Sequence, residues 1–212
     1  MYKVYIVGSV VGCAYHKMFE RNGWEIADTI GEADLIQFTG GADVSPHLYG
    51  EFMSHPSTYS MPTQDLAEVR IFMEATRQKI PMAGICRGGQ FLNVMCGGTM
   101  HQDSRHHAIG GTHMMFTTNG ERIPVSSTHH QIMRPAKHGA LLVAMASEMP
   151  DDVLYLTDEG EEEQTEVVYY PSYRALCYQP HPELVFSGNE ANEECYFDMV
   201  EFFLMNFLGE WG

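Results

Sequence analysis

Residues 84–90 read Gly-Ile-Cys-Arg-Gly-Gly-Gln and follow the short apolar run Ile-Pro-Met-Ala. A cysteine among small residues, after a buried strand and before a helix, is typical of a nucleophile elbow. Gly84 and Gly88 allow the sharp turn and the close approach of strand and helix that an elbow requires. Cys86 would then lie at the N-terminus of a helix beginning near Arg87, where the helix dipole stabilises a thiolate. The alternative is a buried structural cysteine beside a glycine turn.

A cysteine nucleophile needs a base, and the peptide 179–183, Gln-Pro-His-Pro-Glu, offers one. His181 follows an apolar strand-like run, so we expect it at a strand end, as we do Cys86. Prolines on both sides of the histidine leave a stiff turn. Glu183 can accept a hydrogen bond from the imidazole, which predicts the triad Cys86–His181–Glu183. The alternative is an ordinary histidine in a surface turn.

An acyl-transfer site also needs donors for an oxyanion. In elbow enzymes one donor is the backbone N–H after the nucleophile, here that of Arg87. The pair Gly40-Gly41 follows the strand-like run 33–38, and its bare backbone can approach a substrate oxygen. We therefore expect this pair to contribute the second donor; the alternative is a plain turn.

The order of apolar runs predicts an α/β fold: a doubly wound, mostly parallel sheet with antiparallel additions. Polar residues 158–166 predict a solvated turn. The helix expected from Asn189 has Tyr196, Met199, Val200, Phe203 and Phe207 on one apolar stripe, and the helix that Pro62 opens has Leu66, Val69, Phe72 and Thr76. The expected strands are 4–8, 33–38, 81–85, 112–117, 122–126, 141–146, 153–157, 166–170 and 175–178, and the other expected helices are 15–22 and 90–95.

Composition narrows the class of protein. The chain has 212 residues, and we expect 1–212 to form a single domain. Its formal charge of −16 argues against nucleic-acid or anionic-membrane binding, because both need clustered lysine and arginine. The sequence shows no signal-peptide pattern, no membrane-length apolar run and no Cys-x-x-Cys among its five cysteines. These features predict a cytoplasmic protein with reduced thiols.

Five motifs together resemble the class I glutamine amidotransferases, and among them the γ-glutamyl-γ-aminobutyrate hydrolase-like branch. They are 39–51, 84–90, 93–103, 127–131 and 179–183. The resemblance implies a flavodoxin-like fold and hydrolysis of a γ-glutamyl amide through a thioester.

The same resemblance implies roles for individual residues. Cys86 is the nucleophile, His181 the base and Glu183 the residue that orients it. Gly41 and Arg87 are the oxyanion donors. The substrate-binding residues are Gly40, Gln90, His129, His130 and Gln131. Asp65 and Glu68 resemble a helix pair of the hydrolase branch, in which an arginine would stand where this chain has Gln64.

Histidines at 101, 106, 107, 113, 129 and 130 raise the possibility of a metal site, but their spacing fits no compact zinc pattern. No nucleotide-binding glycine loop is present. We therefore expect neither metal nor cofactor.

The first-choice function is release of ammonia from glutamine, for a separate synthetase. A stand-alone γ-glutamyl peptide or amine hydrolase is the second reading. An inactive homologue acting as a binding subunit is the third, and the full triad argues against it.

Overall fold

The computed structural model describes residues 1–8, 10–104, 110–146, 156–157, 160–161, 164–186 and 189–205. The strands are β1 (Lys3–Val7), β2 (Glu25–Ile26), β3 (Leu35–Phe38), β4 (Met82–Ile85), β5 (Thr99–His101), β6 (Gly111–Thr117), β7 (Arg122–Ser127), β8 (Ile132–Arg134), β9 (Leu141–Ala146), β10 (Leu156–Thr157), β11 (Gly160–Glu161), β12 (Thr165–Tyr170) and β13 (Ala175–Tyr178). The helices are α1 (Ala14–Arg21), α2 (Pro62–Gln78), α3 (Arg87–Met95) and α4 (Glu190–Val200), followed by a π-helical turn, Glu201–Met205. Short 3₁₀ turns lie at Ile30–Glu32, Pro46–Tyr49 and Pro171–Tyr173.

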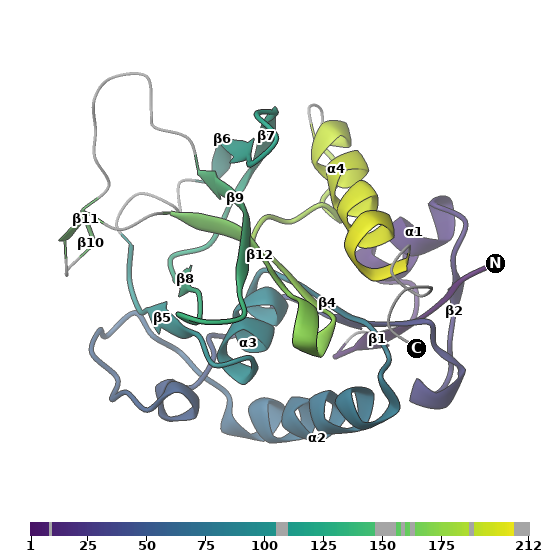
Figure 1. The fold of residues 1–212 in the computed structure, drawn as a ribbon, viewed down its shortest axis with the longest axis horizontal. Helices are drawn as coiled ribbons and strands as arrows, with labels where there is room; N and C mark the ends of the chain where they lie inside the picture. Colours follow the sequence, from purple (N-terminus) through teal and green to yellow (C-terminus); the bar gives the residue numbers. More distant parts are fainter. Residues whose placement is uncertain are drawn as a thin grey trace.

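One large sheet runs through the molecule in the order β2-β1-β3-β4-β13-β12-β9-β6-β7, with β5 and β8 attached beside β12 (Figure 1). The strands from β2 to β13 in this order pair in parallel, and β12, β9, β6 and β7 pair antiparallel. This arrangement confirms the predicted α/β fold with antiparallel additions.

The central strands β3, β4 and β13 are buried at every residue, because helices cover both faces of the sheet. Helices α1 and α4 pack on one face, in a hydrophobic cluster that contains Phe19 and Tyr196. Helices α2 and α3 pack on the other, with Phe72 and Phe91. The carboxyl ends of β3, β4 and β13 therefore meet at one edge, where the predicted site residues follow them.

The apolar face predicted for α2 is only partly right: Phe72 is buried and Val69 packs against the core, but Leu66 and Thr76 are exposed. Leu66 is 56% exposed, and the buried residues are Asp65, Glu68, Phe72 and Ala75. A periodicity argument counted only apolar side chains, whereas this helix buries two carboxylates.

The polar stretch predicted as a solvated turn is only partly so. Residues 160–161 form β11, and Glu166 is buried in β12, where it is 1% exposed. Of the strand expected at 153–157, only 156–157 are described, as β10. Phe207 and residues 106–107 lie outside the described residues.

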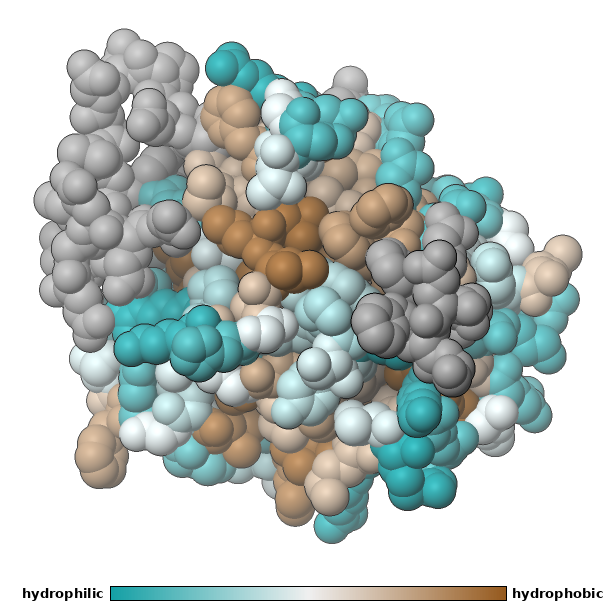
Figure 2. Space-filling view, in the orientation of Figure 1, coloured by the Kyte–Doolittle hydropathy of each residue, from teal (hydrophilic) through white to brown (hydrophobic). Residues whose placement is uncertain are grey.

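None of the helices in the described part of the chain has both the length and the apolar character that a membrane crossing requires. On the face shown in Figure 2, apolar side chains gather over the region where β9 and β12 lie near α4.

Candidate active site

The turn between β4 and α3 has the backbone of a nucleophile elbow. Cys86 lies there with φ +51° and ψ −115°, a conformation that non-glycine residues rarely adopt outside functional sites. A Cβ on Gly84 would lie 2.3 Å from the Gly88 carbonyl, and one on Gly88 would lie 2.4 Å from the Phe38 carbonyl oxygen. Both glycines are therefore required for the strand and helix to approach this closely. The elbow predicted from the sequence is present.

The turn after β13 brings an imidazole to the same edge of the sheet. His181 Nδ1 lies 2.6 Å from Glu183 Oε1, and the His181 backbone N–H donates to Ser126 Oγ at 2.7 Å. The Asn189 side chain donates to the carbonyls of His181, Pro182 and Leu184, which fixes the turn. The structure thus brings the predicted base and its orienting carboxylate together.

The electrostatics join this imidazole to the elbow cysteine. Burial alone would lower the pKa of His181, but the charge and hydrogen bond of Cys86 and the Glu183 carboxylate outweigh it and raise the pKa to about 10. At neutral pH the histidine is therefore protonated between a sulfur and a carboxylate. A protonated imidazole beside a cysteine can donate a proton to a leaving group.

The loop after β3 packs directly against this triad. A Cβ on Gly40 would lie 3.1 Å from His181 Cε1, 3.1 Å from the Tyr15 hydroxyl oxygen and 3.8 Å from Cys86 Cβ. The Gly40 N–H donates to that hydroxyl at 2.9 Å. Tyr15, at the start of α1, is a site residue that the sequence motifs did not reveal, because nothing in its local sequence differs from an ordinary helix aromatic.

The Arg87 side chain ties the elbow to α2. It is 1% exposed, forms ion pairs with Asp65 and Glu68, and donates from Nε to the Ala42 carbonyl at 3.1 Å. Burial lowers the pKa of the guanidinium, and the Asp65 carboxylate opposes this change. Gln64, which stands where the resemblance expects arginine, donates to Glu68 Oε1 at 2.9 Å. The buried face of α2 thus holds the cation that contacts the loop after β3.

The side chains expected to bind substrate are engaged with one another. Gln90 Nε2 donates to the Gln131 carbonyl at 3.3 Å and to Gln179 Oε1 at 3.1 Å. His129 Nδ1 lies 3.0 Å from the same carbonyl. Gln90, Gln131 and His129 are all buried, and these hydrogen bonds join them to one another and to Gln179, two residues before His181.

His130 points into a separate acidic cluster. Its Nε2 lies 3.0 Å from Asp43 and its Nδ1 3.3 Å from Asp103. The hydrogen bond to Asp43, followed by weaker contributions from both carboxylates, raises the pKa of this half-buried histidine against the effect of burial.

Three side chains from different strands could hold a metal ion. His113, His129 and Glu166 place one donor atom each within 4.8 Å of one another, and Glu166 Oε1 lies 3.0 Å from His113 Nε2 and 3.5 Å from His129 Nε2. Burial would raise the pKa of Glu166, yet the two histidines hold it well below the usual range. The His113–Glu166 contact is a hydrogen bond. The absence of a metal stays a prediction.

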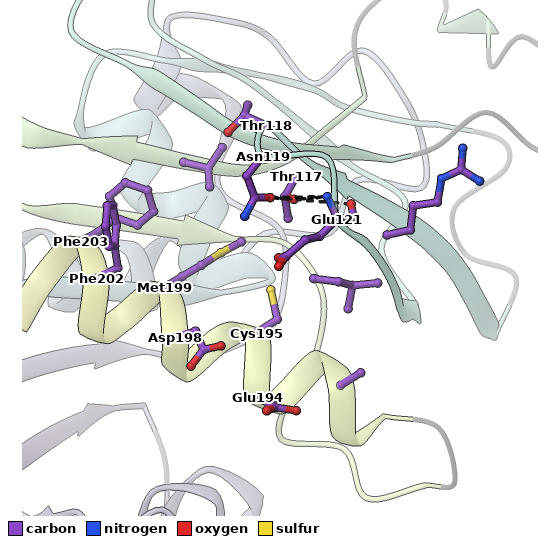
Figure 3. Close-up of a pocket in the computed structure, with 14 residues that line it drawn as sticks. Thr117, Thr118, Asn119, Glu121, Glu194, Cys195, Asp198, Met199, Phe202 and Phe203 are labelled. Atoms are coloured by element: carbon purple, nitrogen blue, oxygen red, sulfur yellow. Dashed lines mark hydrogen bonds between the residues drawn. The ribbon is translucent and has the colours of Figure 1, made fainter.

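A cavity of about 900 Å³ lies elsewhere, between the β6–β7 hairpin and α4 (Figure 3). Figure 3 shows Met199, Phe202 and Phe203 on its α4 side, with Glu121 and Asp198 nearby. None of the triad residues lines it. The candidate chemistry is therefore at the strand ends and not in this cavity.

The chain resembles known proteins in sequence and in fold. The family model described as Peptidase C26 matches residues 4–183. Protein NtpR of Enterococcus hirae is 30% identical over 200 residues, covering 84% of this chain and 77% of that protein. The γ-glutamyl-γ-aminobutyrate hydrolase PuuD of Escherichia coli is 41% identical over 61 residues, covering 29% of this chain and 23% of that protein. A solved glutamine amidotransferase from Thermotoga maritima has a TM-score of 0.61 at 16% identity, covering 95% of this chain and 84% of that one, and so shares the flavodoxin-like fold.

Proposed function

The chain belongs to the peptidase C26 family, and on that premise we propose that it releases ammonia from the γ-amide of glutamine through a γ-glutamyl thioester. The observation that carries the proposal is Cys86 at a positive-φ elbow beside the protonated His181–Glu183 pair. Ammonia would pass to a separate synthetase. Membership of this family supports amidotransferase or γ-glutamyl hydrolase activity. That glutamine is the substrate is our proposal.

The proposed reaction uses only groups of this site. The Cys86 thiolate attacks the γ-amide carbon, and the N–H groups of Arg87 and Gly41 stabilise the oxyanion. His181 then gives its proton to the departing nitrogen, so that ammonia leaves and the thioester forms. Water attacks the thioester while His181 takes its proton, which releases glutamate and restores the thiolate. Glu183 keeps the imidazole oriented through both halves of the reaction.

A second candidate is a stand-alone hydrolase of γ-glutamyl peptides or amines. Two observations favour it: the local identity to PuuD, and the buried pair Asp65 and Glu68 that resembles the hydrolase branch. The chemistry at Cys86 would be the same, with an amine in place of ammonia as the leaving group.

One assay separates the two candidates. Purified protein is given glutamine and, in parallel, a small panel of γ-glutamyl amines and peptides, with Cys86→Ala as the matched inactive control. We expect slow turnover of glutamine by the chain alone, which rises when a synthetase partner is added. Fast turnover of a panel member with glutamine a poor substrate would reject the first choice in favour of the second. No turnover of any compound by a protein whose Cys86 is also unreactive would favour the inactive binding subunit.

A further inference from the structure

The first turn of α1 places a phenol against the loop after β3, beside His181. The Tyr15 oxygen accepts the Gly40 N–H at 2.9 Å, and a Cβ on Gly40 would lie 3.1 Å from both this oxygen and His181 Cε1. We infer that Tyr15 is a positioning residue that holds the loop 39–42 in the conformation in which Gly41 can donate to the oxyanion. This inference rests on the proposed function and names a further part of the same site.

The hydrogen bond to Tyr15 is one of three that join the loop 39–42 to other parts of the chain. The Thr39 hydroxyl donates to the Val7 carbonyl at 2.8 Å, and Arg87 Nε donates to the Ala42 carbonyl at 3.1 Å. The Gly40 N–H is therefore committed to the phenol, and the Gly41 N–H makes no hydrogen bond to any described residue. A backbone donor that is left free beside a nucleophile is what an oxyanion site needs.

The phenol keeps a proton that the loop does not use. Burial, followed by the charge of Glu183, raises the pKa of Tyr15 above its usual range, so the hydroxyl stays protonated. Oε2 of Glu183 is buried and makes no hydrogen bond to any described residue, so it is free to accept one. The observed contact is the one with the loop: the Tyr15 hydroxyl holds Gly40, whose Cα lies beside His181.

The test removes only the oxygen, with Tyr15→Phe, because the ring that packs on the core remains. We expect kcat to fall by about 10²-fold, the lower end of the loss for an oxyanion donor, with KM nearly unchanged. Inactivation by 6-diazo-5-oxo-L-norleucine, whose ketone would lie at the oxyanion position, should slow to a similar degree. Alkylation by iodoacetamide, which reports the thiolate alone, should stay within about twofold because the losses assigned to the oxyanion are absent from it.

Tyr170→Phe is the matched structural control. It removes a buried phenol that bonds Asn93 and the Ala136 N–H in the opposite core cluster, so it should lower the melting temperature and leave both inactivation rates unchanged. A Tyr15→Phe protein whose kcat and diazoketone inactivation match those of the wild type overturns the inference, as does a loss confined to KM.

A readout without substrate separates this inference from the proposed function. Hydrogen exchange of a peptide covering residues 36–45 should be faster in Tyr15→Phe than in wild type, since the Gly40 N–H loses its acceptor. Unchanged exchange overturns the contact itself. If the wild type ignores glutamine and the diazoketone while exchange responds as expected, the proposed substrate fails and the loop contact stands.

Discussion

Replacing Arg87 by methionine should lower the melting temperature of the protein, because it removes a buried cation next to Cys86. The guanidinium is 1% exposed and faces Asp65 and Glu68, which are 2% and 1% exposed. Methionine is of similar length, so the change removes the charge and leaves two carboxylates buried without a cation. Breaking one buried pair costs about 3–5 kcal/mol. For a chain of this size that corresponds to a fall of about 6–20 °C in melting temperature.

The neutral triple variant Arg87→Met, Asp65→Asn, Glu68→Gln is the control for charge. It leaves no uncompensated carboxylate, so most of the lost melting temperature should return. Turnover should stay low, because the Ala42 carbonyl still lacks its donor from Arg87. Thermal melts followed by near-ultraviolet circular dichroism measure the first effect, and the glutamine assay measures the second. A single variant that melts within about 2 °C of wild type would refute the reasoning, because buried pairs of this kind cost far more.

The remaining predictions concern the triad and its surroundings. Limiting iodoacetamide at neutral pH should label Cys86 before cysteines 13, 96, 177 and 195; preferential labelling of another would remove it as nucleophile. His181→Ala should lose nearly all turnover while Glu183→Gln keeps a measurable residue, and the reverse order would reassign the roles. Protonated His181 stabilises the fold fully below about pH 6.5, its unfolded pKa, and this contribution is lost as pH rises through about 10. The melting temperatures of wild type and His181→Ala should therefore converge over that range, and a constant gap would contradict the raised pKa. A chelator should leave turnover unchanged; loss of activity restored by zinc would point to His113, His129 and Glu166.

The elbow and the peptide 179–183 were predictable because each is a contiguous peptide whose stereochemistry is local. Gly84 and Gly88 are needed at fixed offsets from Cys86 whatever the rest of the chain does. Prolines on both sides of His181 likewise restrict the backbone locally, and Asn189 completes the turn. The fold class followed from the alternation of strands and helices, which also depends on short stretches of sequence.

The parts that were missed depend on partners distant in sequence. Asp65 and Glu68 point inward only because Arg87 arrives from the elbow helix to neutralise them. From the sequence, Glu166 belongs to an acidic stretch predicted to be solvated. In the structure it is buried, because His113 and His129 lie beside it. A polar side chain can be buried when another group pairs with it. Here that group lies far away in the sequence, so the residues next to the buried side chain do not predict its burial.

Under the proposed function, the hydrogen bonds along the loop 39–42 bear on how a synthetase would control release of ammonia. The Gly40 N–H is held by Tyr15 and the Ala42 carbonyl by Arg87, so the peptides 39–40 and 42–43 each have a hydrogen bond to a side chain outside the loop. The peptide between Gly40 and Gly41 carries the free N–H, and glycine on both sides lets it rotate at little cost. Since Tyr15 fixes the position of Gly40, a docked partner would need only to favour the orientation of the next peptide in which the Gly41 N–H points to the oxyanion. Control through the orientation of a single peptide is consistent with a subunit whose turnover of glutamine is slow alone and rises when the partner docks.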